Sequence, residues 1–308
     1  MALDSQSLRL LLYARKTGAD FDQTLTVGRL DLLMTATDIE REFSSFGVEL
    51  AAGQAESLSL GRDRFCEPVI EALGATTVDS LDHSTFEGAT VIHDLNQPLP
   101  PELDERFSLV FDGGTLEHVF DFPRALRSCM SLPRLGGHLV MTLPANNHMG
   151  HGFYQFSPDL FYRVFSAENG YRLKGLFLVP TYTHGEWLKV EDPVSVRSRI
   201  GHNTTIEELS LFVLAERTAI VPLFTRSPKQ SDYAAEWAEK PEKGASGSRL
   251  AFYDAAVAGA APNARSERSL LKKFTPAPLL ALRRTLLAAR HIRNAPDPSH
   301  FKPFDPRA

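Results

Sequence analysis

Four short apolar runs, each closed by a turn, alternate with helical segments between residues 63 and 144. The runs cover 76–82, 89–93, 107–111 and 138–144, and helices are predicted over 63–74 and from residue 122 to a Gly-Gly stop at 136–137. Strands that alternate with helices form a parallel sheet with helices on both faces. The chain is therefore predicted to be an α/β protein with a mostly parallel sheet.

An acidic residue closes three consecutive strands of this pattern, namely Asp82, Asp94 and Asp112. Ligands of such sheets bind at the carboxyl ends of the strands. Asp82 is placed to accept hydrogen bonds from both hydroxyls of a ribose, and Asp94 to receive the exocyclic amine of adenine, with Leu95 packing on the ring. Each aspartate alone could instead cap a turn. Three acidic strand ends in succession favour a ligand site.

The segments before residue 63 predict a leading helix over 5–17, a first strand over Thr24–Gly28 and a helix over 38–47 with Asp38 as its N-cap. Ser57–Gly61 resembles the first strand in composition and is predicted as a second strand of the same kind. We prefer Thr24–Gly28 as the first strand of the sheet, with an insertion over about 31–62.

After residue 144, Ser157 as N-cap and Pro158 predict a helix over 157–171. Strands are predicted over 172–180 and 209–217. The polar segment 181–208 favours a loop that covers the site. Composition changes to a linker type around 240–248, so we expect a domain over 1–230 followed by a linker and basic tail over 231–308.

Charge is unevenly distributed along the chain. Residues 264–308 hold 10 Lys and Arg against 3 Asp and Glu, a net of +7, so the total of -5 leaves -12 on the remainder. An acidic main domain argues against nucleic acid as its substrate, because phosphate contacts require Lys and Arg. The amphipathic basic tail is expected to dock on the acidic domain or on an anionic partner.

The chain shows no secretory signal and no apolar run long enough to span a membrane. Its two cysteines, Cys66 and Cys129, form neither a disulfide framework nor a CxxC motif. These features predict a cytoplasmic setting.

Several motifs together resemble a known family. VDSLDHS, ATVIHDLNQPLP, FSLVFDGGTLEHVFD, a Gly-Gly turn and HLVMTLP occur in that order, and GHGFYQFSPDLFYRVFSAENGY follows. This succession, over about residues 20 to 225, is similar to the class I methyltransferases that use S-adenosylmethionine (SAM) on small molecules. The resemblance implies a Rossmann-like, seven-stranded sheet with an antiparallel last strand, and a cofactor lying across strands one, two and four. The cofactor residues would be Gly28, Asp82, Asp94, Leu95 and Asp112.

One departure from that family concerns its glycine-rich GxGxG turn, which lets the backbone approach the cofactor. This chain offers only VGRL at 27–30 or LGRD at 60–63. Two outcomes stay open: a cofactor bound through a rebuilt loop, with Arg29 on its carboxylate, or no bound cofactor.

Histidines are the candidate catalytic residues. Transfer to a hydroxyl requires removal of a proton, and histidine titrates near neutral pH, which favours His118 and His151 as bases. His118 could instead bond to neighbouring backbone. His148 and His151 lie three apart, and His184 and His202 follow, but no set with metal-ligand spacing is evident. No metal is therefore expected.

Three function classes remain. The first is methyl transfer from SAM to a small-molecule or sugar-derived acceptor, at oxygen. The second is an inactive methyltransferase fold that serves as a binding or scaffold module, which the missing GxGxG motivates. The third is an NAD(P)-dependent oxidoreductase, which shares an acid after strand two but also requires the glycine fingerprint.

Overall fold

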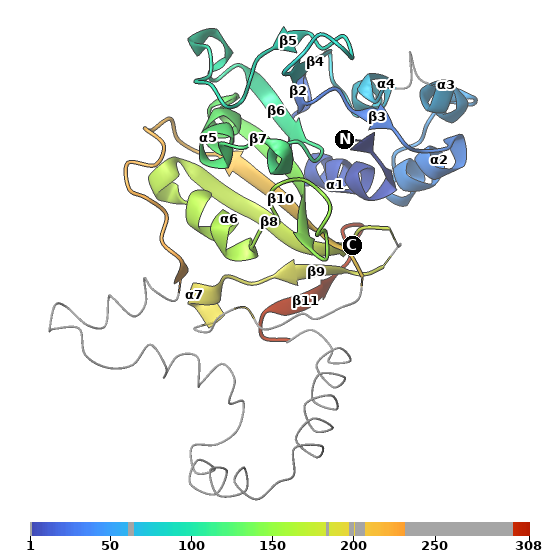
Figure 1. Ribbon diagram of the computed structural model, residues 1–308. Coiled ribbons are helices and arrows are strands. Elements are labelled where there is room, and N and C mark those ends of the chain that lie inside the picture. The colour runs from blue at the N-terminus through green and yellow to red at the C-terminus, as the bar shows by residue number, and fades with distance from the viewer. Residues whose placement is uncertain (1, 61–64, 183–184, 197–199, 201–206, 232–297) are drawn as a thin grey trace, which may run out of the picture. The chain divides into compact units, whose positions relative to one another are not determined.

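The computed structural model describes residues 2–60, 65–182, 185–196, 200, 207–231 and 298–308 (Figure 1). Contacts divide the chain into two compact units. The first comprises Met1–Val190, Glu207–Pro228 and Pro303–Ala308, and the second Glu191–Ile206 and Lys229–Lys302. The expected linker at 240–248, most of the basic tail, His184 and His202 lie outside the described residues.

A nine-stranded sheet has the order β11-β9-β8-β10-β7-β6-β2-β4-β5. The strands are β2 (Gln23–Val27), β4 (Thr77–Asp82), β5 (Val91–Ile92), β6 (Phe107–Asp112), β7 (Pro133–Asn146), β8 (Tyr171–Pro180), β9 (Trp187–Val190), β10 (Leu209–Arg217) and β11 (Phe301–Phe304). Strands β2, β4, β5, β6 and β7 are parallel, and β10 is antiparallel to both β7 and β8. The sheet is thus mixed and larger than the seven strands expected, because β9 and β11 extend it beyond β8.

The five parallel strands have the doubly wound order. Taken along the chain, they are arranged third, second, first, fourth, fifth across the sheet. The order reverses at β2, which pairs with β4 on one side and β6 on the other. Ligands of open α/β sheets bind beside the carboxyl ends of the strands at such a switch point.

The described part of the chain contains seven helices. They are α1 (Ser5–Lys16), α2 (Ala36–Ser45), α3 (Gln54–Leu60), α4 (Glu67–Ala72), α5 (Phe122–Ser131), α6 (Pro158–Val164) and α7 (Pro193–Val196). Three 3-10 turns accompany them: η1 (Pro101–Leu103), η2 (Leu116–His118) and η3 (Ala167–Asn169). Strands β1 (Ala2–Leu3) and β3 (Asp31–Leu32) form a separate parallel pair. No helix formed by these residues has both the length and the apolar character needed to cross a membrane.

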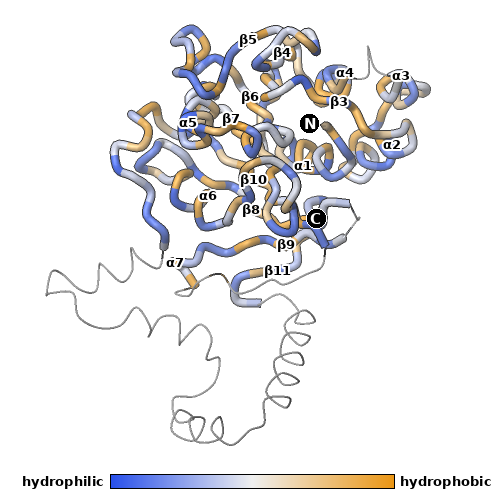
Figure 2. Tube along the Cα trace, viewed as in Figure 1, coloured by the Kyte–Doolittle hydropathy of each residue, from blue (hydrophilic) through white to orange (hydrophobic). Residues whose placement is uncertain are grey.

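Helix α1 shows how the core forms. Asp4 caps it by accepting a hydrogen bond from the Ser7 N–H at 2.8 Å. Leu8, Leu11 and Leu12 are fully buried in a cluster that also contains Leu109 and Phe111 of β6, and each buried leucine contributes about 2 kcal/mol. Figure 2 shows the hydrophobic residues concentrated in α1 and the inner strands. Since side chains alternate along a strand, Asp112 of β6 faces the opposite side of the sheet, towards α5.

The predicted strand over Ser57–Gly61 is wrong, because its described residues, 57–60, form the second half of helix α3. Ala55 and Leu58 are both buried in the core cluster, and their spacing of three residues brings them to one helical face. In α2 the N-cap is Thr35, while Asp38 occupies the third helical position and completes a capping box. Asp38 is therefore not the N-cap that we expected.

Further boundaries differ from the prediction. The helix predicted over 157–171 ends at Val164, and Tyr171 already begins β8. Helix α5 ends at Ser131 and not at the Gly-Gly pair, because Pro133 cannot continue a helix and begins β7 instead. The segment 181–208 is not a simple cover, since its residues Trp187–Val190 form strand β9 against β8. Trp187 is almost fully buried there and donates a hydrogen bond to Gln6 Oε1 at 3.0 Å.

Candidate functional site

The carboxyl ends of β2, β4 and β6 lie side by side. Val27, the last residue of β2, pairs with Leu81 of β4 and with Asp112 of β6. Gly28 follows Val27 and Asp82 follows Leu81, so Gly28, Asp82 and Asp112 are neighbours across three strands. Gly28 has φ +83°, a left-handed conformation that favours glycine, and its N–H donates to the Leu81 carbonyl at 2.6 Å. Sequence and structure therefore agree on where the strand ends meet.

Asp82 and Asp94 both organise turns at this edge. Asp82 Oδ1 accepts a hydrogen bond from the Ser84 N–H at 2.9 Å. Asp94 Oδ1 accepts from the N–H and from the side-chain amide of Asn96, at 2.9 and 2.8 Å, and these bonds hold the pKa of Asp94 below its usual range. Leu95, the residue after Asp94, is buried. One oxygen of each carboxylate is thus already used by its own turn.

Asp112 is the last residue of β6 and is buried under the loop that follows this strand. Its side chain is fully buried, and Oδ1 accepts a hydrogen bond from the Thr115 N–H at 2.8 Å. Thr115 Oγ1 in turn donates to the Val27 carbonyl at 2.5 Å. Asp112 therefore holds the loop after β6 against the end of β2, and in this structure it supports that loop from below.

Glu117 is the site residue that sequence reasoning missed. It stands in η2 between Leu116 and His118, and its side chain is 1 % exposed. Its Oε1 lies 3.3 Å from His151 Nε2 and 3.8 Å from His118 Nε2. The LEHV motif contained the signal, but the prediction assigned a role only to the histidine. We call Glu117, His118 and His151 the acid–histidine cluster.

His151 reaches the cluster from residues 147–156, which we call the histidine loop. The Phe153 N–H donates to the Glu117 carbonyl at 2.7 Å, and the Tyr154 hydroxyl donates to the Phe120 carbonyl at 2.6 Å. Gly152 has φ +71°, and a Cβ there would lie 2.9 Å from Glu117 Cγ. These contacts bring together His118 and His151, whose ring centroids are 5.1 Å apart.

His148 has a different role. It is buried, its Nε2 lies 3.1 Å from the Leu209 carbonyl of β10, and its ring centroid is 5.8 Å from that of His151. His148 therefore anchors the histidine loop to the sheet.

Burial sets the electrostatics of the cluster. It raises the pKa of both Asp112 and Glu117, and the charge of Glu117 raises the pKa of Asp112 further. Burial and the nearby His151 lower the pKa of His118, which favours its neutral form. Within the described residues, Asp112 Oδ2 and Glu117 Oε2 are buried without a hydrogen-bond partner. Two buried carboxyls thus share a site beside two imidazoles.

The Arg29 side chain is held by three neighbours and is not available to a ligand at the strand ends. Its Nε donates to Glu67 Oε1 at 2.7 Å, its Nη1 donates to the Glu87 carbonyl at 2.6 Å, and its guanidinium stacks on the Phe65 ring at 3.9 Å. The side chain therefore links the loop after β2 to the loop after β4. The predicted contact with a cofactor carboxylate would require Arg29 to leave these partners.

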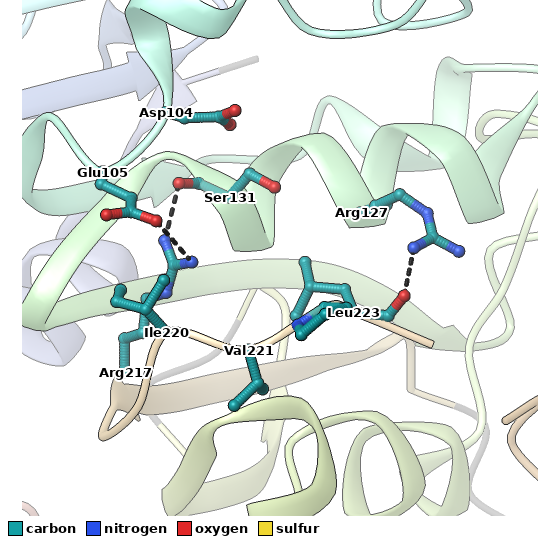
Figure 3. Close-up of a pocket in the computed structure, with 9 residues that line it drawn as sticks. Asp104, Glu105, Arg127, Ser131, Arg217, Ile220, Val221 and Leu223 are labelled. Carbon is teal, nitrogen blue, oxygen red and sulfur yellow. Dashed lines mark hydrogen bonds and ion pairs between the residues drawn. The ribbon is translucent and has the colours of Figure 1, made fainter. Parts of the chain in front are cut away.

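A hollow of about 380 Å³ lies elsewhere (Figure 3). Glu105 precedes β6 and Arg217 ends the antiparallel β10, so the hollow lies at the amino ends of the parallel strands. Its arginines are occupied: Arg217 Nη1 donates to the Ser131 carbonyl at 2.8 Å, and Arg127 Nη1 donates to the Leu223 carbonyl. Both guanidinium groups therefore already bind backbone carbonyls.

Comparisons with known proteins place the chain in no family. No family model matches it, and no curated protein matches it. Solved structures similar to this chain include a Burkholderia thailandensis 1,6-didemethyltoxoflavin-N1-methyltransferase with bound S-adenosylhomocysteine, at 13 % identity over 70 % of this chain and 79 % of that one, with a TM-score of 0.38. The [4+2]-cyclase SpnF matches at 13 % identity over 71 % and 84 %, also with a TM-score of 0.38. The methyltransferase CalH, in complex with S-adenosylhomocysteine, matches at 12 % identity over 69 % and 57 %, with a TM-score of 0.34.

Proposed function

We propose that this protein is a SAM-dependent methyltransferase that methylates an oxygen of a small-molecule or sugar-derived acceptor. The observation that carries the proposal is the register at the switch point, where Val27 pairs with both Leu81 and Asp112. This register brings Gly28, whose backbone is in the left-handed region, and Asp82 at the end of β4 to the edge where doubly wound sheets bind nucleotides. The motif resemblance to class I methyltransferases supports the same assignment.

The cofactor would lie across the ends of β2, β4 and β6, with its adenine at the turn that follows β5. Asp82 would accept hydrogen bonds from the ribose hydroxyls, and Asp94 would receive the adenine amine, with Leu95 against the ring. Gly28 has no side chain to obstruct the methionine part of the cofactor. Asp112 would contribute by holding the loop after β6.

The acid–histidine cluster would serve the acceptor. In methyl transfer the acceptor oxygen attacks the methyl carbon, the carbon–sulfur bond breaks, and its electron pair stays on sulfur, which leaves S-adenosylhomocysteine. The acceptor O–H proton must go to a base. His151, oriented by Glu117 at 3.3 Å, and the neighbouring His118 are the proposed bases. The chemistry otherwise requires alignment of the acceptor and exclusion of water.

An exposed aromatic rim beside the cluster would contact the acceptor. Phe120 and Phe153 are mostly exposed, with ring centroids 6.4 Å apart in an edge-to-face arrangement. Tyr154 lies next to Phe153 and packs on Phe122. Such rings favour an acceptor with an apolar or planar part.

Arg29 gives a specific reason to keep the scaffold alternative. Its bond to the Glu87 carbonyl connects the two loops between which the cofactor would lie, and its bond to Glu67 attaches the same side chain to α4. If those bonds persist, the edge would bind no SAM. The protein would then retain the fold as a binding module. The oxidoreductase alternative gains no such observation, because one glycine follows β2 where the nucleotide fingerprint has three.

Isothermal titration of the full chain with SAM and with S-adenosylhomocysteine tests the proposal. Micromolar binding is expected, and Asp82→Ala should weaken it by about 1 to 3 kcal/mol, or roughly 5- to 150-fold. Asp79→Ala is the matched control, since Asp79 lies earlier on β4 and pairs with Arg106. An absence of heat from a sample that melts cooperatively would favour the scaffold module, and binding of NADH would favour the oxidoreductase.

A further inference from the structure

The acid–histidine cluster combines the side-chain types of a transition-metal site. Glu117, His118 and His151 each offer one ligand atom, and these atoms all lie within 4.8 Å of one another. Two imidazoles with one carboxylate suit zinc and non-haem iron, whereas calcium and magnesium prefer oxygen ligands alone. The sequence spacing did not predict this site because its members come from two loops.

The separations within the cluster fit one ion. Two ligands that bind an ion at about 2.1 Å with a tetrahedral angle are about 3.4 Å apart. Glu117 Oε1 is 3.3 Å from His151 Nε2 and 3.8 Å from His118 Nε2. Only small side-chain movements are therefore needed for all three to bind one cation.

The surroundings of Glu117 add a second, independent reason. Its carboxylate is buried, and among the described residues its ion-pair partners are the imidazoles of His118 and His151, with no Lys or Arg paired to it or to the nearby Asp112. Its Oε2 has no hydrogen-bond partner there either. A buried carboxylate is costly unless it is paired or bound to a metal. The imidazoles, about half exposed, leave the cluster open to solvent.

We propose that Glu117, His118 and His151 bind a divalent transition-metal ion, with at least one coordination position open. The proposal does not depend on methyl transfer, because it rests on the donor set and its geometry. Where the proposed methyl transfer uses this cluster, the imidazoles would be ligands and not bases: the ion would bind the acceptor oxygen and lower the pKa of its hydroxyl, and the hydroxyl proton would pass to solvent water. That consequence does rest on the proposed function.

Zinc titration of the full chain, stripped with a chelator, tests the site. Competition with a chromophoric chelator should give one tight site per chain. Glu117→Gln and His151→Asn should each weaken it by at least tenfold. Co²⁺ provides a second measurement, because its visible absorption should appear in the unsubstituted protein and be lost in His151→Asn.

The controls separate this site from other histidines. His83→Asn removes an exposed histidine near Asp94 and should leave zinc affinity unchanged. His118→Asn alters an exposed ligand, so it tests the site even if substitution of the buried Glu117 prevents folding. Equal zinc affinity and equal cobalt spectra in all variants would overturn the proposal. If the unsubstituted protein binds zinc at this cluster and binds no SAM, the result counts against the proposed methyltransferase function and leaves the metal site in place.

Discussion

Replacing Gly152 with alanine tests how closely the histidine loop packs on Glu117. The residue has φ +71°, and an added Cβ would lie 2.9 Å from both Glu117 Cγ and the Glu117 carbonyl oxygen. Alanine in the left-handed region costs about 1 to 2 kcal/mol, and an overpacked contact costs about 1 to 3 kcal/mol. The free energy of unfolding should therefore fall by about 2 to 5 kcal/mol.

Two glycines serve as matched controls for this change. Gly53→Ala measures the conformational cost alone, because its φ is +77° and nothing lies within 4 Å of an added Cβ. Gly150→Ala, two residues away in the same loop, has open space and no left-handed φ, so it should be nearly neutral. Urea unfolding followed by circular dichroism gives all three values. If Gly152→Ala destabilises the protein no more than Gly53→Ala does, the close contact with Glu117 is absent.

Three further changes test other contacts. Burial lowers the pKa of His138 below that of the unfolded chain, so the unfolded state takes up the proton more readily, and stability is lost as the pH falls from about 6.5 towards the lowered pKa. His138→Leu should therefore reduce the loss of unfolding free energy on acidification, measured by urea unfolding at several pH values. An unchanged dependence on pH would contradict this. Tyr171→Phe removes a hydrogen bond from the buried hydroxyl to the Met130 carbonyl at 2.5 Å and should cost about 1 kcal/mol in the same assay; no change would show that the bond contributes nothing. Thr115→Val removes the hydrogen bond to the Val27 carbonyl, so the loop after β6 loses an attachment to β2. The affinity for SAM, measured by calorimetry, should fall. An unchanged affinity would show that this loop does not affect cofactor binding.

The inner sheet could be predicted because its signals are local. Apolar runs end at turn residues, and the structure places β4, β6 and β7 over the predicted segments. Asp82 and Asp112 end β4 and β6, as the pattern indicates. Strand β9 could not be found in this way. Its Trp187 is buried because it packs against Phe177 of β8 and Phe212 of β10, contacts that the local pattern does not contain.

Helix α3 shows the limit of short patterns. The segment SLSLG alternates polar and apolar residues, which is typical of a strand. Leu58 also fits a helix, because it lies three residues after Ala55 and the two form one buried face. Contact with the core decided between two conformations that the local pattern allowed equally.

The acid–histidine cluster depends on contacts that no short motif contains. Glu117 and His151 are 34 residues apart, and what joins them is the hydrogen bond from the Phe153 N–H to the Glu117 carbonyl together with the close approach of Gly152. The LEHV and GHGFYQ motifs supply residue types that are suited to proton transfer or metal binding, but neither motif specifies the distance between them. A change at position 152 could therefore disable the cluster while leaving Glu117, His118 and His151 in place. Ligand residues alone are consequently insufficient evidence for this site in another chain, because a side chain at position 152, directly before Phe153 in the histidine loop, would displace either Glu117 or His151.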